Sequence, residues 1–280
     1  MPSGGRLPYF DMLLEGRAAG HPASEVLSRF VHWGYWEDPA KADGGTEDFK
    51  AAMGRLNDEL LREAGVTDGQ AVLDAGCGFG GTLAAIDAGY KGMRLTGVNI
   101  DERQLEVARG NVPGREGNAV TFVTGDACSM PLSDAAFDRV LAVECIFHFP
   151  SRLGFLREAA RVLKPGGRLV LSDFVPYDPA AAPSWPGRWL TREVAKGYGS
   201  LGSGWPDGDY AAMAGKAGLE LVVDRDITRH TLPTYPVMMG LLRRETGPAV
   251  DALLWATRLL DWSSRLGLVR YRIAAFRKPS

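Results

Sequence analysis

The stretch from Ala71 to Gly81 constrains the fold of this chain more than any other part of the sequence. A short apolar run, Ala71 to Leu73, ends at the acid Asp74, and glycines follow at positions 76, 78, 80 and 81 before a helical pattern from Thr82 to Ala88. This order predicts a buried strand, a glycine-rich turn and a helix. Glycines adopt positive φ and let backbone N–H groups approach a ligand that a Cβ would hold away. A ligand bound there would lie at the carboxyl end of a parallel strand and against a helix N-terminus.

Size and composition favour one large α/β domain. The chain has 280 residues, of which 45% are hydrophobic, and its net charge of -2 comes without a long basic run. The charge argues against binding to nucleic acid or to an anionic membrane. We find no apolar run of transmembrane length and no signal peptide in the polar start of the sequence. The three scattered cysteines indicate neither a disulfide framework nor a zinc site, and we predict no metal and a cytoplasmic location.

A glycine pattern of this kind also occurs in ordinary tight turns and in phosphate-binding dinucleotide sites. The run Val-Leu-Asp-Ala-Gly-Cys-Gly-Phe-Gly-Gly, however, resembles the first motif of class I S-adenosylmethionine-dependent methyltransferases. Gly-Asp-Ala at 125–127 resembles the adenine motif of that family, and residues 158–169 resemble its post-motif segment. The resemblance is strong over 71–174.

The resemblance implies a doubly wound, Rossmann-like sheet of seven mostly parallel strands with an antiparallel last strand. We expect three parts: an N-terminal helical lid over residues 1–64, a cofactor-binding core over 65–176, and an acceptor-side cap with a helical insertion and the last strands of the core over 177–280. The insertion, 234–265, could form a wall of the acceptor site or a surface for a homodimer.

The resemblance also implies S-adenosylmethionine as cofactor and S-adenosylhomocysteine as its product. In a doubly wound fold an acid at the end of the second strand usually binds the ribose hydroxyls, but this chain has Asn99 there and Asp101 two residues later. We predict that Asn99 binds the ribose, that Ile100 lies beside the adenine and that Gln104 is close by. Asp126 either accepts the adenine amine or serves as a turn or cap acid. The full set of predicted cofactor residues is Asp74, Gly76, Cys77, Gly78, Gly80, Asn99, Ile100, Gln104, Asp126, Ala127 and Glu144.

Candidate catalytic residues follow the fourth predicted strand, Arg139 to Val143. Glu144 and His148 are four positions apart, so one helical turn would place them on one face. Such a pair is suited to removing a proton from the acceptor. Both could instead be structural, His148 as a satisfied histidine and Glu144 as a helix-start acid. His32 is a further candidate base for an oxygen acceptor.

Aromatic side chains are dense between Phe30 and Pro39 and again after Pro176. The first group is either a plug that packs the N-terminal segment onto the core or a lid that lines the pocket. We predict that the acceptor site is lined by Trp33, Tyr35, Trp36, Phe149, Tyr177, Trp185 and Trp189.

The predicted activity is methyl transfer to carbon or oxygen of a small apolar or aromatic acceptor in secondary metabolism. One alternative is a cyclase or isomerase that keeps the cofactor pocket, because fold does not fix function. A nicotinamide-dependent oxidoreductase would require Gly-x-Gly-x-x-Gly and an acid in place of Asn99. A sensor that uses the pocket without catalysis is the fourth possibility.

Overall fold

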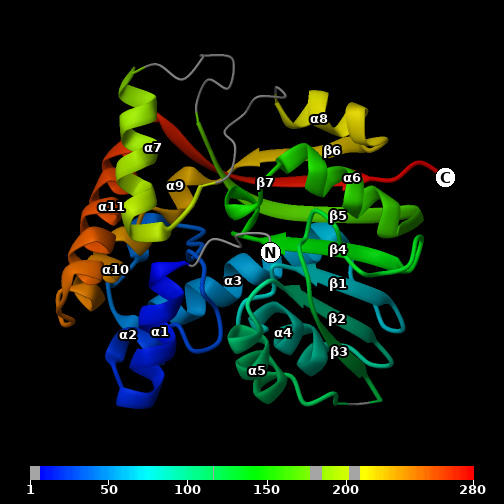
Figure 1. Cartoon of the computed structure of the whole chain (residues 1–280), viewed down its shortest axis with the longest axis horizontal. Coiled ribbons are helices and arrows are strands. Elements are labelled where there is room, and N and C mark those ends of the chain that lie inside the picture. Colours follow the sequence, from blue (N-terminus) through cyan, green and yellow to red (C-terminus); the bar gives the residue numbers. More distant parts are fainter. Residues whose placement is uncertain (1–6, 116, 177–184, 202–208) are drawn as a thin grey trace.

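The computed structural model of the chain describes residues 7–115, 117–176, 185–201 and 209–280. Its centre is a seven-stranded sheet with the order β3-β2-β1-β4-β5-β7-β6 (Figure 1). The strands are β1 (Ala71–Ala75), β2 (Arg94–Asn99), β3 (Ala119–Thr124), β4 (Phe137–Val143), β5 (Leu163–Pro176), β6 (Glu220–Asp226) and β7 (Val269–Arg277). β7 runs antiparallel to both of its neighbours, and the other pairs are parallel. The predicted sheet, including its antiparallel last strand, is confirmed.

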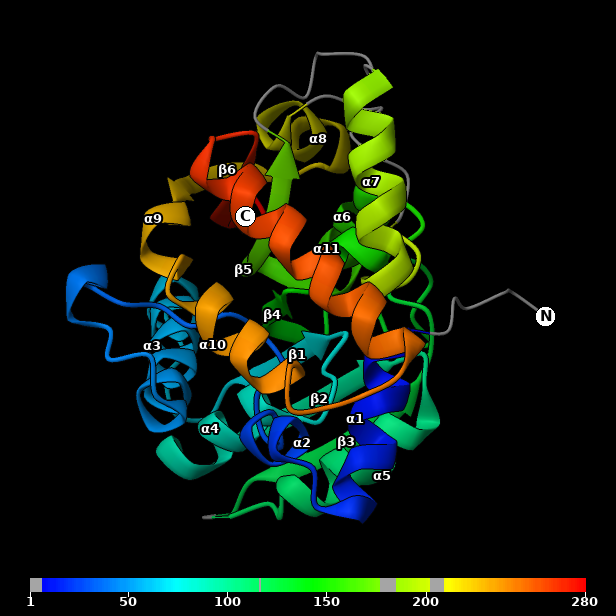
Figure 2. The same ribbon diagram turned by 90° about the vertical axis from the view of Figure 1, so that its left-hand side faces the viewer.

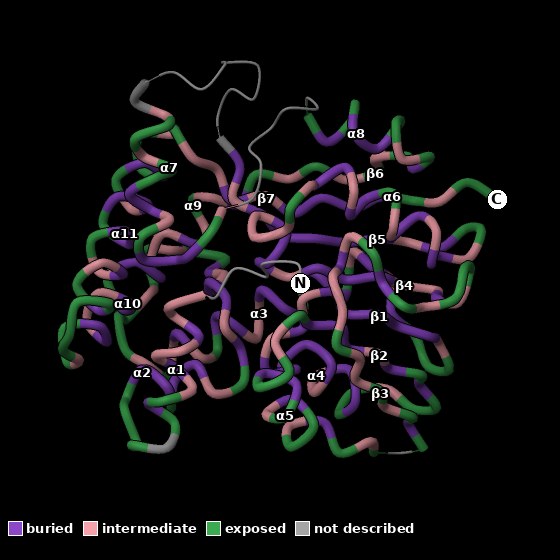
Figure 3. The backbone as a smooth tube through the Cα atoms, in the orientation of Figure 1, coloured by how far each residue is buried: buried purple, intermediate pink, exposed green. Residues whose placement is uncertain are grey.

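Successive residues of the central strands enter two different hydrophobic cores, because side chains alternate between the faces of a sheet. Val72, Leu141 and Val170 belong to one core, whereas their neighbours Leu73, Val140 and Leu169 belong to the other. Both faces are therefore covered, as parallel strands require. Figure 3 shows the central strands buried along most of their length.

Helices cover the two faces of the sheet. One face carries α3 (Thr46–Ala64), α4 (Gly81–Gly89) and α5 (Glu102–Asn111), and the other carries α6 (Arg152–Val162) and α8 (Tyr210–Ala217). The periodic apolar residues of α3, among them Phe49, Met53 and Leu56, are fully or almost fully buried. The helix ends at Gly65, whose φ of 62° is the left-handed conformation that glycine adopts readily.

The remaining helices gather beside the sheet, on the left of Figure 1 and toward the viewer in Figure 2. They are α1 (Pro8–Ala19), α2 (Pro22–Val26), α7 (Trp185–Tyr198), α9 (Thr228–Thr231), α10 (Thr234–Leu242) and α11 (Pro248–Arg265), with a short 3-10 turn, η1, at Pro39–Lys41. α1 contacts α7 and α11, so the start of the chain packs against its C-terminal third. None of the helices in the described part of the chain is both long and apolar enough to cross a membrane.

The predicted helical insertion, 234–265, consists of two helices, α10 and α11. Gly247, whose φ is 126°, precedes Pro248 at the start of α11. Residues 164–167 lie within the bounds of β5, where the register with β4 shifts between Phe137 and Arg139. The glycine at position 166 has a φ of 75° and accommodates this irregularity.

Candidate active site

A cavity of about 880 Å³ lies where β1, β2, β3 and β4 end. Its floor comes from the residues after each strand, and its cover comes from α1 and the segment that follows α2. The predicted residues that line it are Asp74, Gly76, Cys77, Gly78, Asn99, Ile100, Gln104, Asp126, Ala127, Glu144, His148, Phe149 and His32. Residues from every part of the sequence that was predicted to bind cofactor therefore meet in one space.

The glycine loop needs its glycines. Gly76 has a φ of 77°, and a Cβ at this position would lie 2.8 Å from Sγ of Cys145. Its N–H donates to the carbonyl of Val98 at 2.8 Å, which ties the loop to β2. Gly80 differs from the other predicted cofactor residues, because it caps α4 and is not part of the cavity lining. A Cβ at Gly80 would lie 3.0 Å from that of Ala108, so this glycine allows α5 to pack closely.

Asp74 is a buried acid on the cavity wall. It is 2% exposed, its Oδ1 has no hydrogen-bond partner, and burial raises its pKa to about 7. A buried carboxylate without a partner is costly, so such an atom calls for a donor from a bound ligand. The α-ammonium group of S-adenosylmethionine is a cationic donor of the kind that this oxygen lacks, and the cofactor fits the site in this respect.

The polar groups after β2 form their own network. Asn99 donates through Nδ2 to Oε1 of Gln104 at 3.0 Å and accepts from the backbone N–H of Asp101 at 3.0 Å. Asp101, two residues after Asn99, also lines the cavity, and its carboxylate accepts from Arg103, with Nη2 at 2.6 Å from Oδ2. Hydrogen bonds from Arg103 lower the pKa of Asp101. Ile100 is 49% exposed and offers apolar surface to a ligand in the cavity.

Asp126 makes a turn contact and also faces the cavity. Its Oδ1 accepts from the backbone N–H of Cys128 at 2.8 Å, which is the contact of a turn acid. The residue also lines the cavity together with Ala127.

Glu144 follows β4 and adopts an unusual backbone conformation with a φ of 51°. The prediction that one helical turn joins it to His148 is therefore wrong: the left-handed residue ends the strand, and only Ile146–His148 form a 3-10 turn, η2. Oε2 of Glu144 accepts from the backbone N–H of Trp33 at 2.8 Å and from Oη of Tyr271 at 2.6 Å. Burial raises the pKa of Glu144 to about 8.

The two histidines on the cavity wall are neutral at physiological pH, because burial lowers the pKa of each to about 4. Nδ1 of His148 lies 2.9 Å from the carbonyl oxygen of Ser200, and Nδ1 of His32 lies 2.8 Å from that of Trp33. A carbonyl oxygen only accepts, so both rings carry their proton on Nδ1 and present Nε2 as an acceptor. Nε2 of His148 lies 3.4 Å from the hydroxyl of Tyr9, whereas Nε2 of His32 is buried without a partner.

Comparison with known proteins agrees with this geometry. The profile of the methyltransferase domain family matches residues 73–171. Methyltransferase GfsG of Streptomyces halstedii is 37% identical over 229 residues, which are 80% of this chain and 75% of that protein. The 27-O-demethylrifamycin SV methyltransferase of Amycolatopsis mediterranei (strain S699) is 36% identical over 206 residues, covering 73% of this chain and 72% of that protein.

The chain belongs to the class I S-adenosylmethionine-dependent methyltransferase family. The assignment confirms the predicted family and argues against the nicotinamide-dependent alternative. Among solved structures, the (4+2)-cyclase SpnF superimposes on this methyltransferase with a TM-score of 0.73 at 26% identity, covering 95% of this chain and 92% of that one.

Of the aromatic residues predicted to line the acceptor site, Phe149 is in the lining of this cavity. Trp33, Tyr35 and Trp36 do not line the cavity. Trp33 packs its ring edge-on against Phe174 and Tyr235, with centroid distances of 5.4 and 5.7 Å. The packing of Trp33 fits the predicted plug, whereas Phe30 and His32 of the same run line the cavity, as the predicted lid would.

The neighbours of the other aromatics explain their positions. Trp36 is 3% exposed and donates from Nε1 to Asp48 at 2.7 Å, and Tyr35 stacks on His230 at 4.9 Å. Trp189 lies on α7 and is 38% exposed, outside the cavity lining. Trp185 begins α7, but its side chain is outside the described residues, as is the whole of Tyr177.

Six further residues from the start of α1 and the segment after α2 also line the cavity: Leu7, Tyr9, Phe10, Arg29, Phe30 and Val31. The aromatic run that begins at Phe30 was the sequence signal for part of this wall, whereas no predicted site residue lies at positions 7–10. Across the described residues, no group of three or more His, Cys, Asp or Glu side chains is placed to hold a metal ion.

Proposed function

We propose that this methyltransferase methylates a hydroxyl group of a small natural product and that Glu144 removes the hydroxyl proton. The observation that carries the proposal is the continuity of one cavity from the glycine loop to Glu144. An oxygen acceptor is supported by the Amycolatopsis relative, whose name specifies O-methylation, and several further relatives carry the name O-methyltransferase.

Asp74 and His32 would hold the amino-acid end of the cofactor. Both present buried acceptor atoms, Oδ1 and Nε2, that have no partner in the protein, and both line the cavity. The α-ammonium group of S-adenosylmethionine has three N–H donors, which suits two such acceptors. Asn99 and Asp126 would hold the ribose and the adenine, since they lie after β2 and β3 on the same edge of the sheet.

When bound, S-adenosylmethionine supplies an electrophilic methyl group on a positively charged sulfur. The protein has to align the acceptor with that methyl group, and alignment in the best intramolecular models contributes roughly 7–11 kcal/mol. It also has to take the proton from the hydroxyl, because methylation of oxygen makes that proton strongly acidic.

Three side chains compete for the role of base, and their pKa values separate them. A general base works best when its pKa lies near the working pH. Glu144, with a pKa of about 8, meets this condition, whereas His32 and His148 have pKa values of about 4 and are weaker bases. Nε2 of His148 also faces the hydroxyl of Tyr9. Glu144 is therefore the base of the proposed reaction.

The test is transfer of an isotope-labelled methyl group from S-adenosylmethionine to a panel of hydroxylated natural products. A labelled methyl ether in the product supports the proposal, and Glu144→Gln should lower kcat at saturating cofactor while leaving the affinity for S-adenosylhomocysteine within about threefold. Methylation only at carbon or nitrogen, by a protein that binds the cofactor, would contradict it.

A second candidate is a cyclisation that does not consume the methyl group, because SpnF is 26% identical over nearly the whole chain. Such an enzyme would convert its substrate at unchanged S-adenosylmethionine concentration. Counting S-adenosylhomocysteine formed per molecule of substrate converted distinguishes the two reactions.

The division into lid, core and acceptor-side cap, the cytoplasmic location and a homodimer are also part of the proposal. The location is supported by the three cysteines, which are all free. Light scattering of the full chain tests the homodimer.

A further inference from the structure

Glu144 is held by contacts from distant parts of the chain in a backbone conformation that residues with a side chain seldom adopt. Its φ of 51° lies in the left-handed region, which is unfavourable for glutamate. Its own N–H donates to the carbonyl and to Oγ of Ser172 on β5, at 3.2 and 3.1 Å. Strain of this kind persists only where the surroundings fix it, and it is frequent at functional sites.

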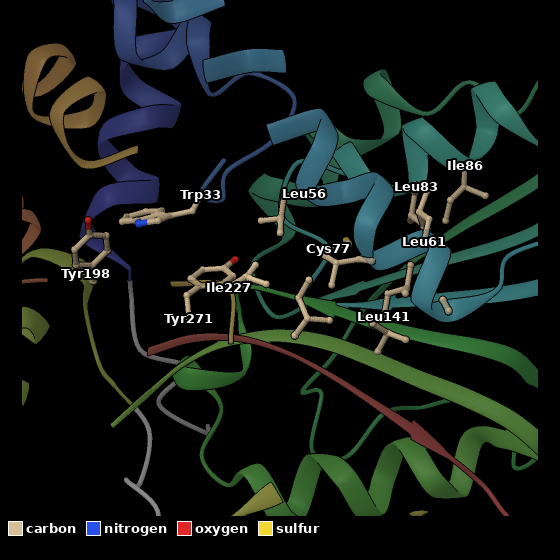
Figure 4. Packing of buried hydrophobic residues seen from close by; sticks show 14 of the residues in the cluster. Trp33, Leu56, Leu61, Cys77, Leu83, Ile86, Leu141, Tyr198, Ile227 and Tyr271 are labelled. Carbon is tan, nitrogen blue, oxygen red and sulfur yellow. The ribbon is translucent and has the colours of Figure 1, made fainter. Parts of the chain in front are cut away.

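Tyr271 is the side chain that contacts the carboxyl group itself. It lies on β7, is 1% exposed, and donates from Oη to Oε2 of Glu144 at 2.6 Å. The same hydroxyl lies 3.1 Å from Oγ of Ser172, so one polar chain runs from β5 through β7 to the end of β4. The ring of Tyr271 is fixed in turn by Phe174, edge-on at 4.7 Å. Figure 4 shows Tyr271 within the buried cluster, together with Trp33 and Tyr198.

These contacts distinguish the two oxygens of Glu144. Oε2 accepts from Tyr271 and from the N–H of Trp33, so both of its favourable acceptor directions are used. No hydrogen bond from the described residues is directed to Oε1, and Glu144 is part of the cavity wall. The oxygen that is left for a ligand is therefore Oε1.

We propose that Tyr271 is a positioning residue of this enzyme: it holds Glu144 by Oε2 so that Oε1 meets the acceptor. The inference rests on the proposed role of Glu144 as base. Tyr271 does not contact the acceptor, because it is enclosed in the core and is not part of the cavity lining.

Other titratable groups around Glu144 come from several elements and make no hydrogen bond to it. Together with burial, which is the larger effect, Glu144 raises the pKa of Tyr9 on α1, Cys145 beside it, Tyr198 on α7 and Tyr235 on α10. Of the groups without a hydrogen bond, Asp173 on β5 is the one that acts on the pKa of Glu144 itself. Asp173 raises the pKa of Glu144, whereas the hydrogen bonds from Trp33 and Tyr271 lower it against the larger effect of burial. Removing the Tyr271 hydroxyl should therefore make the carboxylate harder to form.

The test is a pH titration of Glu144 in the full chain, labelled with carbon-13 at the glutamate carboxyl carbon. The Glu144 resonance is the one that Glu144→Gln lacks. We expect Tyr271→Phe to raise the Glu144 pKa by about one to two units. This is the pKa change that corresponds to losing one hydrogen bond to a charged group. The matched control is Tyr235→Phe, which removes a buried hydroxyl bonded to Ser264 at 2.8 Å rather than to Glu144 and should leave the pKa unchanged.

A Glu144 pKa in Tyr271→Phe equal to that of the control would overturn the proposal. If Tyr271→Phe does not fold, Ser172→Ala provides the second variant, since it removes the hydroxyl that contacts both the Tyr271 hydroxyl and the Glu144 N–H. Ser172→Ala should also raise the Glu144 pKa, and an unchanged pKa would again contradict the inference. With a known acceptor, Tyr271→Phe should lower kcat and shift its pH profile to higher pH with little change in KM.

The outcome is separable from the proposed function. A raised Glu144 pKa in Tyr271→Phe, in an enzyme that methylates no hydroxyl, would contradict the proposed reaction but not the positioning role. Hydroxyl methylation that Tyr271→Phe leaves unchanged at every pH would contradict the positioning role but not the proposed reaction.

Discussion

The backbone N–H of Trp33 donates to Oε2 of Glu144 at 2.8 Å, joining residues that are 111 positions apart in the chain. The contact ties the segment after α2 to the end of β4. Trp33 was predicted to face the acceptor with its side chain. Its side chain instead packs against Phe174 and Tyr235, and its backbone N–H contacts the site. Packing of this segment is thus coupled to the charge state of the acid that we assign as base.

The first prediction concerns stability against pH. Glu144 and Asp74 have folded pKa values of about 8 and about 7, above the ordinary values of 4.5 and 3.8, so the folded protein keeps these protons to higher pH than the unfolded chain and loses stability as pH rises. The histidines at positions 32 and 148, with folded pKa values lowered to about 4 from 6.5, have the opposite effect between those values. Of these four side chains, only Glu144 and Asp74 contribute above pH 6.5, each by up to about 1.4 kcal/mol per pH unit.

Chemical unfolding between about pH 6.5 and pH 8 measures this loss. We expect the free energy of unfolding to fall over this pH range. In Glu144→Gln the free energy of unfolding should fall much less, because glutamine does not titrate. Equal slopes in the two proteins would show that Glu144 is already ionised at the lower pH.

The second prediction is that affinity for S-adenosylhomocysteine rises with pH up to about 7 and is flat above it. Asp74 has to be ionised to pair with the α-ammonium group, and its pKa in the free protein is about 7. Below that value the affinity should change by up to about tenfold per unit. Calorimetry at several pH values measures it. Asp74→Asn should bind more weakly with no such dependence, and a dependence that survives this substitution would assign it to another group.

The third prediction separates the cofactor role of His32 from a role as base. His32→Ala should weaken binding of S-adenosylhomocysteine by roughly tenfold, the loss of about one hydrogen bond to a charged group. Binding of 5′-deoxy-5′-methylthioadenosine, which lacks the amino-acid end, should be unchanged. Equal weakening of both ligands would remove His32 from the amino-acid end of the site.

The fourth prediction concerns Trp36, which is part of the core. Trp36→Ala should destabilise the fold by about 3–5 kcal/mol, because it opens a large cavity, and it also removes the bond from Nε1 to Asp48. Affinity for S-adenosylhomocysteine should stay the same, since Trp36 is not in the cavity lining. Unfolding and calorimetry on the same preparation provide both numbers. Weaker binding at unchanged stability would instead support the prediction that Trp36 lines the pocket.

The order of elements was predictable because local patterns determine it. The apolar period of α3 and the glycine after it predict a helix and its end, and the structure has both. The glycine loop was predictable for a similar reason, since Gly76 requires a conformation and a close approach that other residues cannot meet.

The details around Glu144 were not predictable, because distant residues determine them. Its left-handed φ depends on Ser172 and its carboxyl orientation on Tyr271, which is 127 positions away. The aromatics present a different difficulty. Tryptophan is equally suited to a core and to a pocket wall, so the residue type alone does not show whether a given tryptophan is buried in the core or lines a pocket. For Trp36 the tertiary packing decides, because its ring stacks on Phe49 of α3.

Calorimetric titration with S-adenosylmethionine and S-adenosylhomocysteine, repeated on Asp126→Ala, measures whether this cavity binds the cofactor. We expect micromolar binding of both ligands by the natural sequence, and binding to Asp126→Ala that is weaker by roughly tenfold through loss of a hydrogen bond to the adenine. A folded protein that binds neither ligand would contradict the assignment of this cavity as the cofactor site.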